Sequence, residues 1–118
     1  MIRYDPPLHM FVRTAAADVE VAGVRIPAGA PVAALLGAAN RDPAVFIDPD
    51  TFDAGRDPNP HAGSGAGLHF CLGAPLARIE LQAALTALLD RPFALAREPV
   101  PRPTFVLRAY TAVPLTLG

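Results

Sequence analysis

The sequence predicts an α+β fold that combines one long helix with small antiparallel β-sheets. Three observations predict it: a single strong helical segment over 74–90, short β-type stretches before and after it, and 14 prolines and 9 glycines that keep most elements short. Hydrophobic residues make up 52% of the 118 residues and charged residues 18%, which argues against intrinsic disorder. We therefore expect one domain at most, or part of one, over 1–118 with a modest core.

The segment 1–39 is expected to be rich in β-structure. Residues 10–15 are typical of a strand, and the alternating apolar side chains on either side of Gly23 predict a short hairpin over 19–26. An apolar strand is expected over 32–36. No helical period competes with these assignments.

Three further segments complete the chain. Residues 40–73 form a long loop dense in Asp, Pro, Asn and Gly, and loops of this length are usually functional. The helix over 74–90 carries Pro75 in its first turn, where a missing N–H is harmless. Its apolar residues lie on nearly all faces of the helix, which predicts burial from several sides. The segment 91–118 predicts further strands broken by prolines and ending in a terminal hairpin.

Charge and hydropathy exclude several classes of partner. The net charge is -1 and the arginines are scattered, so no basic stripe predicts binding to nucleic acid. No run approaches the roughly 20 apolar residues that cross a bilayer, and prolines interrupt the first ten residues, so neither a membrane span nor a secretory signal is expected. We expect a cytoplasmic protein, because a single cysteine forms no internal disulfide and suits a reducing compartment.

That single cysteine, Cys71, lies in a glycine-rich loop immediately before the predicted helix. Gly63, Gly65 and Gly67 permit close approach of the backbone, and Gly73 lets the chain bend into the helix. The positive end of the helix dipole then favours the thiolate form of the sulfur. Such a thiolate suits a nucleophile, a redox sensor or a metal ligand. The alternative is a small buried hydrophobic residue.

Residues 63–78, GSGAGLHFCLGAPLAR, resemble the haem-binding loop of bacterial cytochromes P450. The pattern of that loop is Phe-x-x-Gly-x-x-x-Cys-x-Gly followed by an Ala-Arg pair. The resemblance extends over almost the whole chain, since RYDPP, GVRIPAG, GAANRDPAVF and DPNPH resemble segments that precede this loop, and RPTFVLR resembles the sheet segment that follows. It implies that 1–118 is a single partial domain, the carboxy-terminal part of the mainly-α P450 fold, truncated at its amino end.

By this resemblance Cys71 is the axial thiolate ligand of the iron of haem b. Phe70 is expected to pack near the macrocycle. The resemblance also implies further cofactor contacts: cations on the haem propionates from His69 and Arg13, and backbone without obstructing side chains at Gly65 and Gly73.

The implied function is haem-thiolate monooxygenation of a small organic substrate by dioxygen, with electrons from a ferredoxin-type or similar donor. The parts of the family that cover the distal haem face and bind the substrate precede this region. We therefore expect this chain alone to be inactive. The alternative is a non-catalytic haem-binding or partner-docking fragment of a truncated P450.

Three positions depart from the family pattern. Arg3 resembles the arginine of the Glu-x-x-Arg motif, but no glutamate precedes it, and Thr51 stands where a third, basic member is expected. A buried arginine without a carboxylate is costly, so we expect Arg3 to face water. Ser64 replaces the phenylalanine that shields the thiolate, and its hydroxyl could admit water to the sulfur.

Two other classes of site are less well supported by the residues. A Rossmann-type nucleotide site requires Gly-x-Gly-x-x-Gly between a strand and a helix, but Phe70 stands at the third glycine position and a proline-rich loop precedes the motif. A zinc site could use His61, His69 and Cys71, but no fourth ligand is evident.

Overall fold

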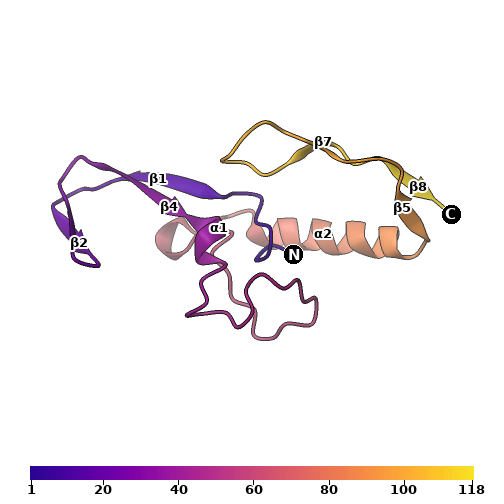
Figure 1. Cartoon of the computed structure of the whole chain (residues 1–118), viewed down its shortest axis with the longest axis horizontal. Coiled ribbons are helices and arrows are strands. Elements are labelled where there is room, and N and C mark those ends of the chain that lie inside the picture. The colour runs from indigo at the N-terminus through magenta and orange to yellow at the C-terminus, as the bar shows by residue number, and fades with distance from the viewer. The chain divides into compact units, whose positions relative to one another are not determined.

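The computed structural model describes all residues, 1–118, and the chain divides into two compact units, Met1–Gly63 and Ser64–Gly118. Figure 1 labels their elements. All sheets are antiparallel strand pairs, two in each unit. The predicted α+β class, with one long helix and small antiparallel sheets, is confirmed.

The first unit is built on two strand pairs and one helical turn. The hairpin is the predicted one, and its two-residue turn places Ala22 and Gly23 at φ 50° and 79°, which matches the twist of the flanking strands. The other pair brings Arg13 opposite Val32. The elements of this unit are β1 (Met10–Thr14), β2 (Val19–Val21), β3 (Val24–Ile26), β4 (Pro31–Leu35) and α1 (Leu36–Ala39).

The strand predicted over 32–36 lies one residue earlier in the structure, because helix α1 begins at Leu36. Strand β4 ends at Leu35, and the chain turns because the amide of Asn40 donates to the carbonyl of Leu36 at 3.0 Å. Leu36 is buried at 7% exposure, as is Phe46 in the long loop that follows. These two side chains form the small apolar core of the unit.

Arg3 does not face water, so that prediction is wrong. The side chain is 3% exposed, and its guanidinium group donates to the carbonyl of Asn40 at 2.7 Å and to the carbonyl of Pro49 at 3.2 Å. The guanidinium also lies 4.9 Å from the centre of the Phe46 ring. Burial lowers the pKa of Arg3, and the neighbouring charge of Arg56 lowers it further. Carbonyl dipoles and an aromatic face thus surround the buried guanidinium group, and the charge of Asp50 acts in the opposite direction on its pKa.

The second unit contains the long helix, whose predicted position is confirmed. Helix α2 runs over Ala74–Leu89, with Pro75 in its first turn. Only Ala74 is buried, so within this chain the helix is not enclosed from several sides as expected. The physical reason is that the strands beside it in sequence are two or three residues long and offer little surface. No helix combines the length and apolar character needed to cross a bilayer.

The predicted terminal hairpin is wrong. Strand β8 (Leu115–Leu117) pairs with β5 (Phe93–Leu95), while β7 (Tyr110–Ala112) pairs with β6 (Val100–Pro101). The two residues between β7 and β8 include Pro114, whose fixed negative φ does not suit the positive-φ turns that close tight hairpins. Strands β7 and β8 therefore pair with the earlier strands β6 and β5 instead of with each other.

We predict that Arg3→Ala lowers the free energy of unfolding by about 2–4 kcal/mol, because it leaves one buried and one partly buried carbonyl group without this donor. Arg25→Ala is the matched control, because Arg25 belongs to an exposed ion pair with Asp18 and such pairs contribute little. Urea denaturation of both variants measures the difference. An equal, small effect in both would show that the buried contacts of Arg3 do not stabilise the unit.

A second prediction concerns pH. The hydrogen bond from Arg25 at 2.6 Å, and that from the amide of Ala28 at 2.9 Å, hold the pKa of Asp18 below its ordinary value. The stability this contributes is present above the ordinary Asp titration range and is lost as pH falls through the lowered pKa. An NMR titration of the side-chain carboxyl should show the shift, and Arg25→Gln should raise the pKa. A titration unchanged in the variant would contradict this assignment.

Candidate functional site

The loop that carries Cys71 is closed by backbone hydrogen bonds. The amide of Cys71 donates to the carbonyl of Ser64 at 3.0 Å, and the amide of Phe70 donates to the carbonyl of Gly67 at 3.0 Å. The turn requires left-handed backbone, with Gly65 at φ 74° and Gly67 at φ 70°. Side chains rarely adopt this conformation, so the glycines are what allow the loop to close. The single turn η1 (Gly67–His69) begins at the second of these glycines and ends two residues before Cys71.

The sulfur of Cys71 lies at the beginning of α2. The carbonyl of Cys71 accepts a hydrogen bond from the amide of Ala74 at 3.1 Å, and no side chain caps the helix. A Cβ atom added to the N-cap residue, Gly73, would lie 3.9 Å from the sulfur. The positive end of the helix dipole is therefore close to Sγ.

Cys71 is free and exposed, so the alternative of a small buried hydrophobic residue is wrong. Its neighbours are also exposed, although they are apolar: Leu68 at 103%, Leu72 at 98% and Phe70 at 48%. An apolar rim around a sulfur ligand is the kind of surface that a large apolar ligand covers. Sequence reasoning missed both leucines as site residues. The available signal was their position beside the cysteine in a loop of mainly small residues.

The structure places the two cationic site candidates in different units. His69 ends the turn η1, two residues from Cys71, and is exposed. Arg13 lies on β1 of the first unit, where its guanidinium donates to the carbonyl of Val12 at 3.0 Å and lies 5.0 Å from the centre of the Phe11 ring. Both side chains keep donors available to an anion.

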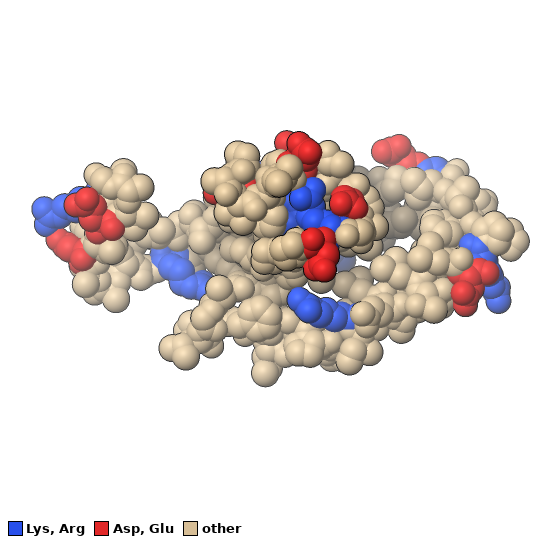
Figure 2. All heavy atoms as spheres, turned by 90° about the horizontal axis from the view of Figure 1, so that it is seen from below, with Lys and Arg blue, Asp and Glu red and all other residues tan.

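Elsewhere the charged side chains lie in small separate groups. On the face drawn in Figure 2, several arginines lie beside acidic side chains and no large patch of one sign is seen. The pair of Arg41 and Asp50, at 2.5 Å, is one such group, and this bond raises the pKa of Arg41. The structure forms no group of three or more His, Cys, Asp and Glu side chains that could hold a metal ion, as the zinc alternative would require.

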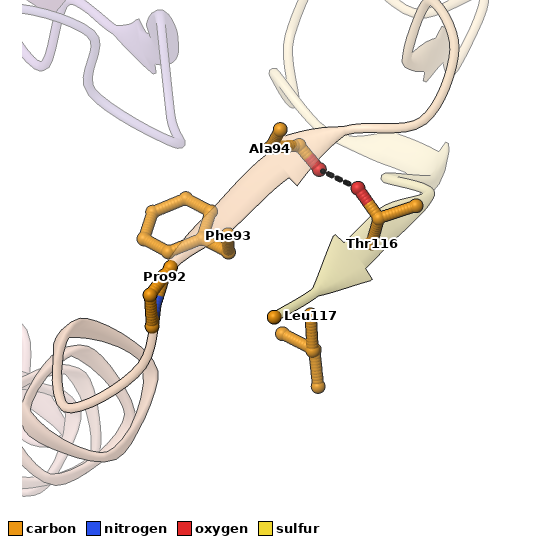
Figure 3. Close-up of a pocket in the computed structure, with 6 residues that line it drawn as sticks. Pro92, Phe93, Ala94, Thr116 and Leu117 are labelled. Atoms are coloured by element: carbon orange, nitrogen blue, oxygen red, sulfur yellow. Dashed lines mark hydrogen bonds between the residues drawn. The ribbon is translucent and has the colours of Figure 1, made fainter.

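A hollow of about 350 Å³ lies between β5 and β8 of the second unit, away from the residues of the Cys71 loop in sequence (Figure 3). It is open, and the carbonyl of Ala94 accepts a hydrogen bond from the hydroxyl of Thr116 at 3.3 Å on its wall. No titratable side chain lines it. It therefore offers neither a ligand for iron nor a charged partner for an anion. Its lining consists of Pro92, Phe93, Ala94, Thr116, Leu117 and Gly118.

A comparison with known proteins shows the family to which a chain with this loop belongs. The family model of the cytochromes P450 matches residues 1–107 of the chain. The chain belongs to the cytochrome P450 family. Members of the cytochrome P450 family carry haem b held by a cysteine thiolate. The side chain of Cys71 offers a donor of that type.

Relatives of this P450 chain include the biotin biosynthesis cytochrome P450 of Bacillus subtilis (strain 168), which is 46% identical over 118 residues. The 6-deoxyerythronolide B hydroxylase of Saccharopolyspora erythraea is 43% identical over 122 residues. The matches cover 98% and 99% of this chain but only 30% of each relative, so the chain spans less than a third of their length.

Solved P450 structures are similar to the chain as well. The structure of P450BioI in complex with an acyl carrier protein ligated to hexadec-9Z-enoic acid has a TM-score of 0.95 and 47% identity. It covers 99% of this chain, and the chain covers 31% of it. The antibiotic-biosynthesis P450 OxyD has a TM-score of 0.90 and 45% identity.

We predict that Gly67→Ala opens the loop and Gly73→Ala does not. An alanine at 67 meets no atom within 4 Å but must adopt φ 70°, which costs about 1–2 kcal/mol. An alanine at 73 meets only the sulfur at 3.9 Å, an ordinary contact, and its φ of -80° is unstrained. Hydrogen exchange of the Cys71 amide should accelerate in the first variant alone. Equal exchange in both would show that left-handed backbone at Gly67 does not hold the loop.

Proposed function

We propose that this chain supplies the thiolate side of a haem-thiolate monooxygenase, with Cys71 as the axial ligand of the iron. The observation that supports the proposal is the exposed sulfur of Cys71 at the uncapped N-terminus of α2, surrounded by exposed apolar side chains. The donor fits the group, because a thiolate is a strong ligand for haem iron and needs no other protein ligand on its own side. By the resemblance to the family, Gly65 and Gly73 would keep side chains away from the macrocycle.

When bound, the haem supplies the activation of dioxygen and the insertion of one oxygen atom into an organic substrate. Cys71 contributes a negative charge and electron density to the metal. The helix dipole of α2 stabilises that charge, and the closed backbone of the loop fixes the direction of the sulfur. The residues of the site therefore orient and tune the cofactor.

The remaining site residues would contact the propionates and the macrocycle of the cofactor. By the resemblance to the family, His69 and Arg13 would each pair with an anionic propionate, since charge-assisted hydrogen bonds to carboxylates are strong. Phe70, which is 48% exposed in this chain, would pack near the macrocycle. Ser64 contributes its carbonyl to the loop and, lacking an aromatic ring, leaves one side of the sulfur less shielded.

The partners of the proposed activity are a small organic substrate and an electron donor of the ferredoxin type. The relatives support an organic substrate, because one is named as a hydroxylase of 6-deoxyerythronolide B and a solved neighbour is bound to a fatty-acyl carrier protein. The free thiol of Cys71 suits a reducing compartment, so the proposal places the protein in the cytoplasm.

The proposal predicts a thiolate spectrum from the full chain. Ferric haem is added to the protein, reduced and exposed to carbon monoxide, and the red-shifted band of a thiolate-bound complex should appear. Cys71→Ser should remove that band, because a serine hydroxyl is not ionised at neutral pH and is a weak ligand. Leu72→Ala is the matched control, since it alters the neighbouring residue and keeps the sulfur. The same band in Cys71→Ser, or no band in the unmodified chain, would contradict the proposal.

A further inference from the structure

We propose that Asn40 is a positioning residue that fixes the point from which the Cys71 loop departs. This inference rests on the proposed function of Cys71. Asn40 ends α1 and is 1% exposed, so its polar groups act inside the protein. It joins three parts of the first unit that are distant in sequence.

The contacts of Asn40 are short and run in different directions. Its side-chain oxygen Oδ1 accepts a hydrogen bond from the amide of Ala62 at 2.7 Å. Its backbone oxygen accepts one from the buried guanidinium of Arg3, also at 2.7 Å. Asn40 therefore couples the buried cation to the chain segment that leads into the loop.

The residue after Ala62 is held from a second side. A Cβ atom on Gly63 would lie 3.0 Å from Cγ2 of Ile2 and 3.2 Å from its carbonyl oxygen, so the backbone is closely packed there. Ser64 follows directly, and its carbonyl accepts the amide of Cys71. The acceptor that closes the loop is thus covalently attached to a point fixed by Asn40 and Ile2.

The role of Asn40 depends on its oxygen and not on its nitrogen. The atom Nδ2 is buried and has no hydrogen-bond partner, which is unusual for a buried donor. An aspartate would keep the acceptor for Ala62 and remove the unpaired donor. Its charge would lie on the residue whose backbone oxygen already accepts a hydrogen bond from the cationic guanidinium of Arg3. Asn40→Asp is therefore the conservative variant that should preserve the function.

The experiment compares Asn40→Ala with Asn40→Asp in the full chain. Loss of the acceptor should accelerate hydrogen exchange at Ala62 and Cys71 about three- to ten-fold, the factor expected for one net hydrogen bond. The haem-loaded protein should then show less of the thiolate-type carbon monoxide band and more of the unshifted form. The aspartate variant should retain slow exchange and the thiolate band.

Two further variants separate positioning from general stability. Leu36→Ala removes a buried side chain of the same unit without touching Ala62, and it should leave the band unchanged after global unfolding is corrected for. Gly63→Ala forces the backbone away from Ile2 and should mimic Asn40→Ala, which keeps the test decisive if the latter does not fold.

Three results would overturn the role of Asn40: unchanged exchange at Cys71 in Asn40→Ala, equal loss in the aspartate variant, or the same spectral change in Leu36→Ala. Hydrogen exchange at the Cys71 amide can be measured without haem. Accelerated exchange in a protein that never shows a thiolate band would therefore reject the proposed function and retain the positioning role of Asn40.

Discussion

The hydrogen bond between the amide of Cys71 and the carbonyl of Ser64 is the constraint on which the site depends. It closes a loop that has almost no side-chain packing of its own, and it brings the cysteine to the beginning of α2. Without this closure the sulfur would sample many directions, and the helix dipole would act on it only part of the time. The two left-handed glycines make the bond possible, since a side chain at either position would strain the turn.

A second constraint, the burial of Arg3, organises the first unit. The buried charge is accommodated because two carbonyl groups and the face of Phe46 surround the guanidinium. The chain segments that provide these partners are the end of α1 and the loop around Pro49, so the buried cation links these two segments.

Local patterns predicted the parts of the fold that local chemistry determines. The helix α2, the hairpin around Gly23 and the loop before Cys71 depend on turn residues and periodicity, which are visible in the sequence. The pairing of β5 with β8 was missed because it joins distant segments, and only the unsuitability of Pro114 for a tight turn hinted at it. The burial of Arg3 was missed because its acceptors, Asn40 and Pro49, are 37 and 46 residues away. The exposure of the leucines beside Cys71 follows from loop geometry that no periodic pattern encodes.

The most direct test of the central claim is X-ray absorption at the iron edge of the full chain loaded with ferric haem. The account predicts a shell of one sulfur atom in addition to the four porphyrin nitrogens, and loss of that shell in Cys71→Ser. An iron surrounded by nitrogen and oxygen alone in the unmodified protein would contradict the assignment of Cys71 as the axial ligand.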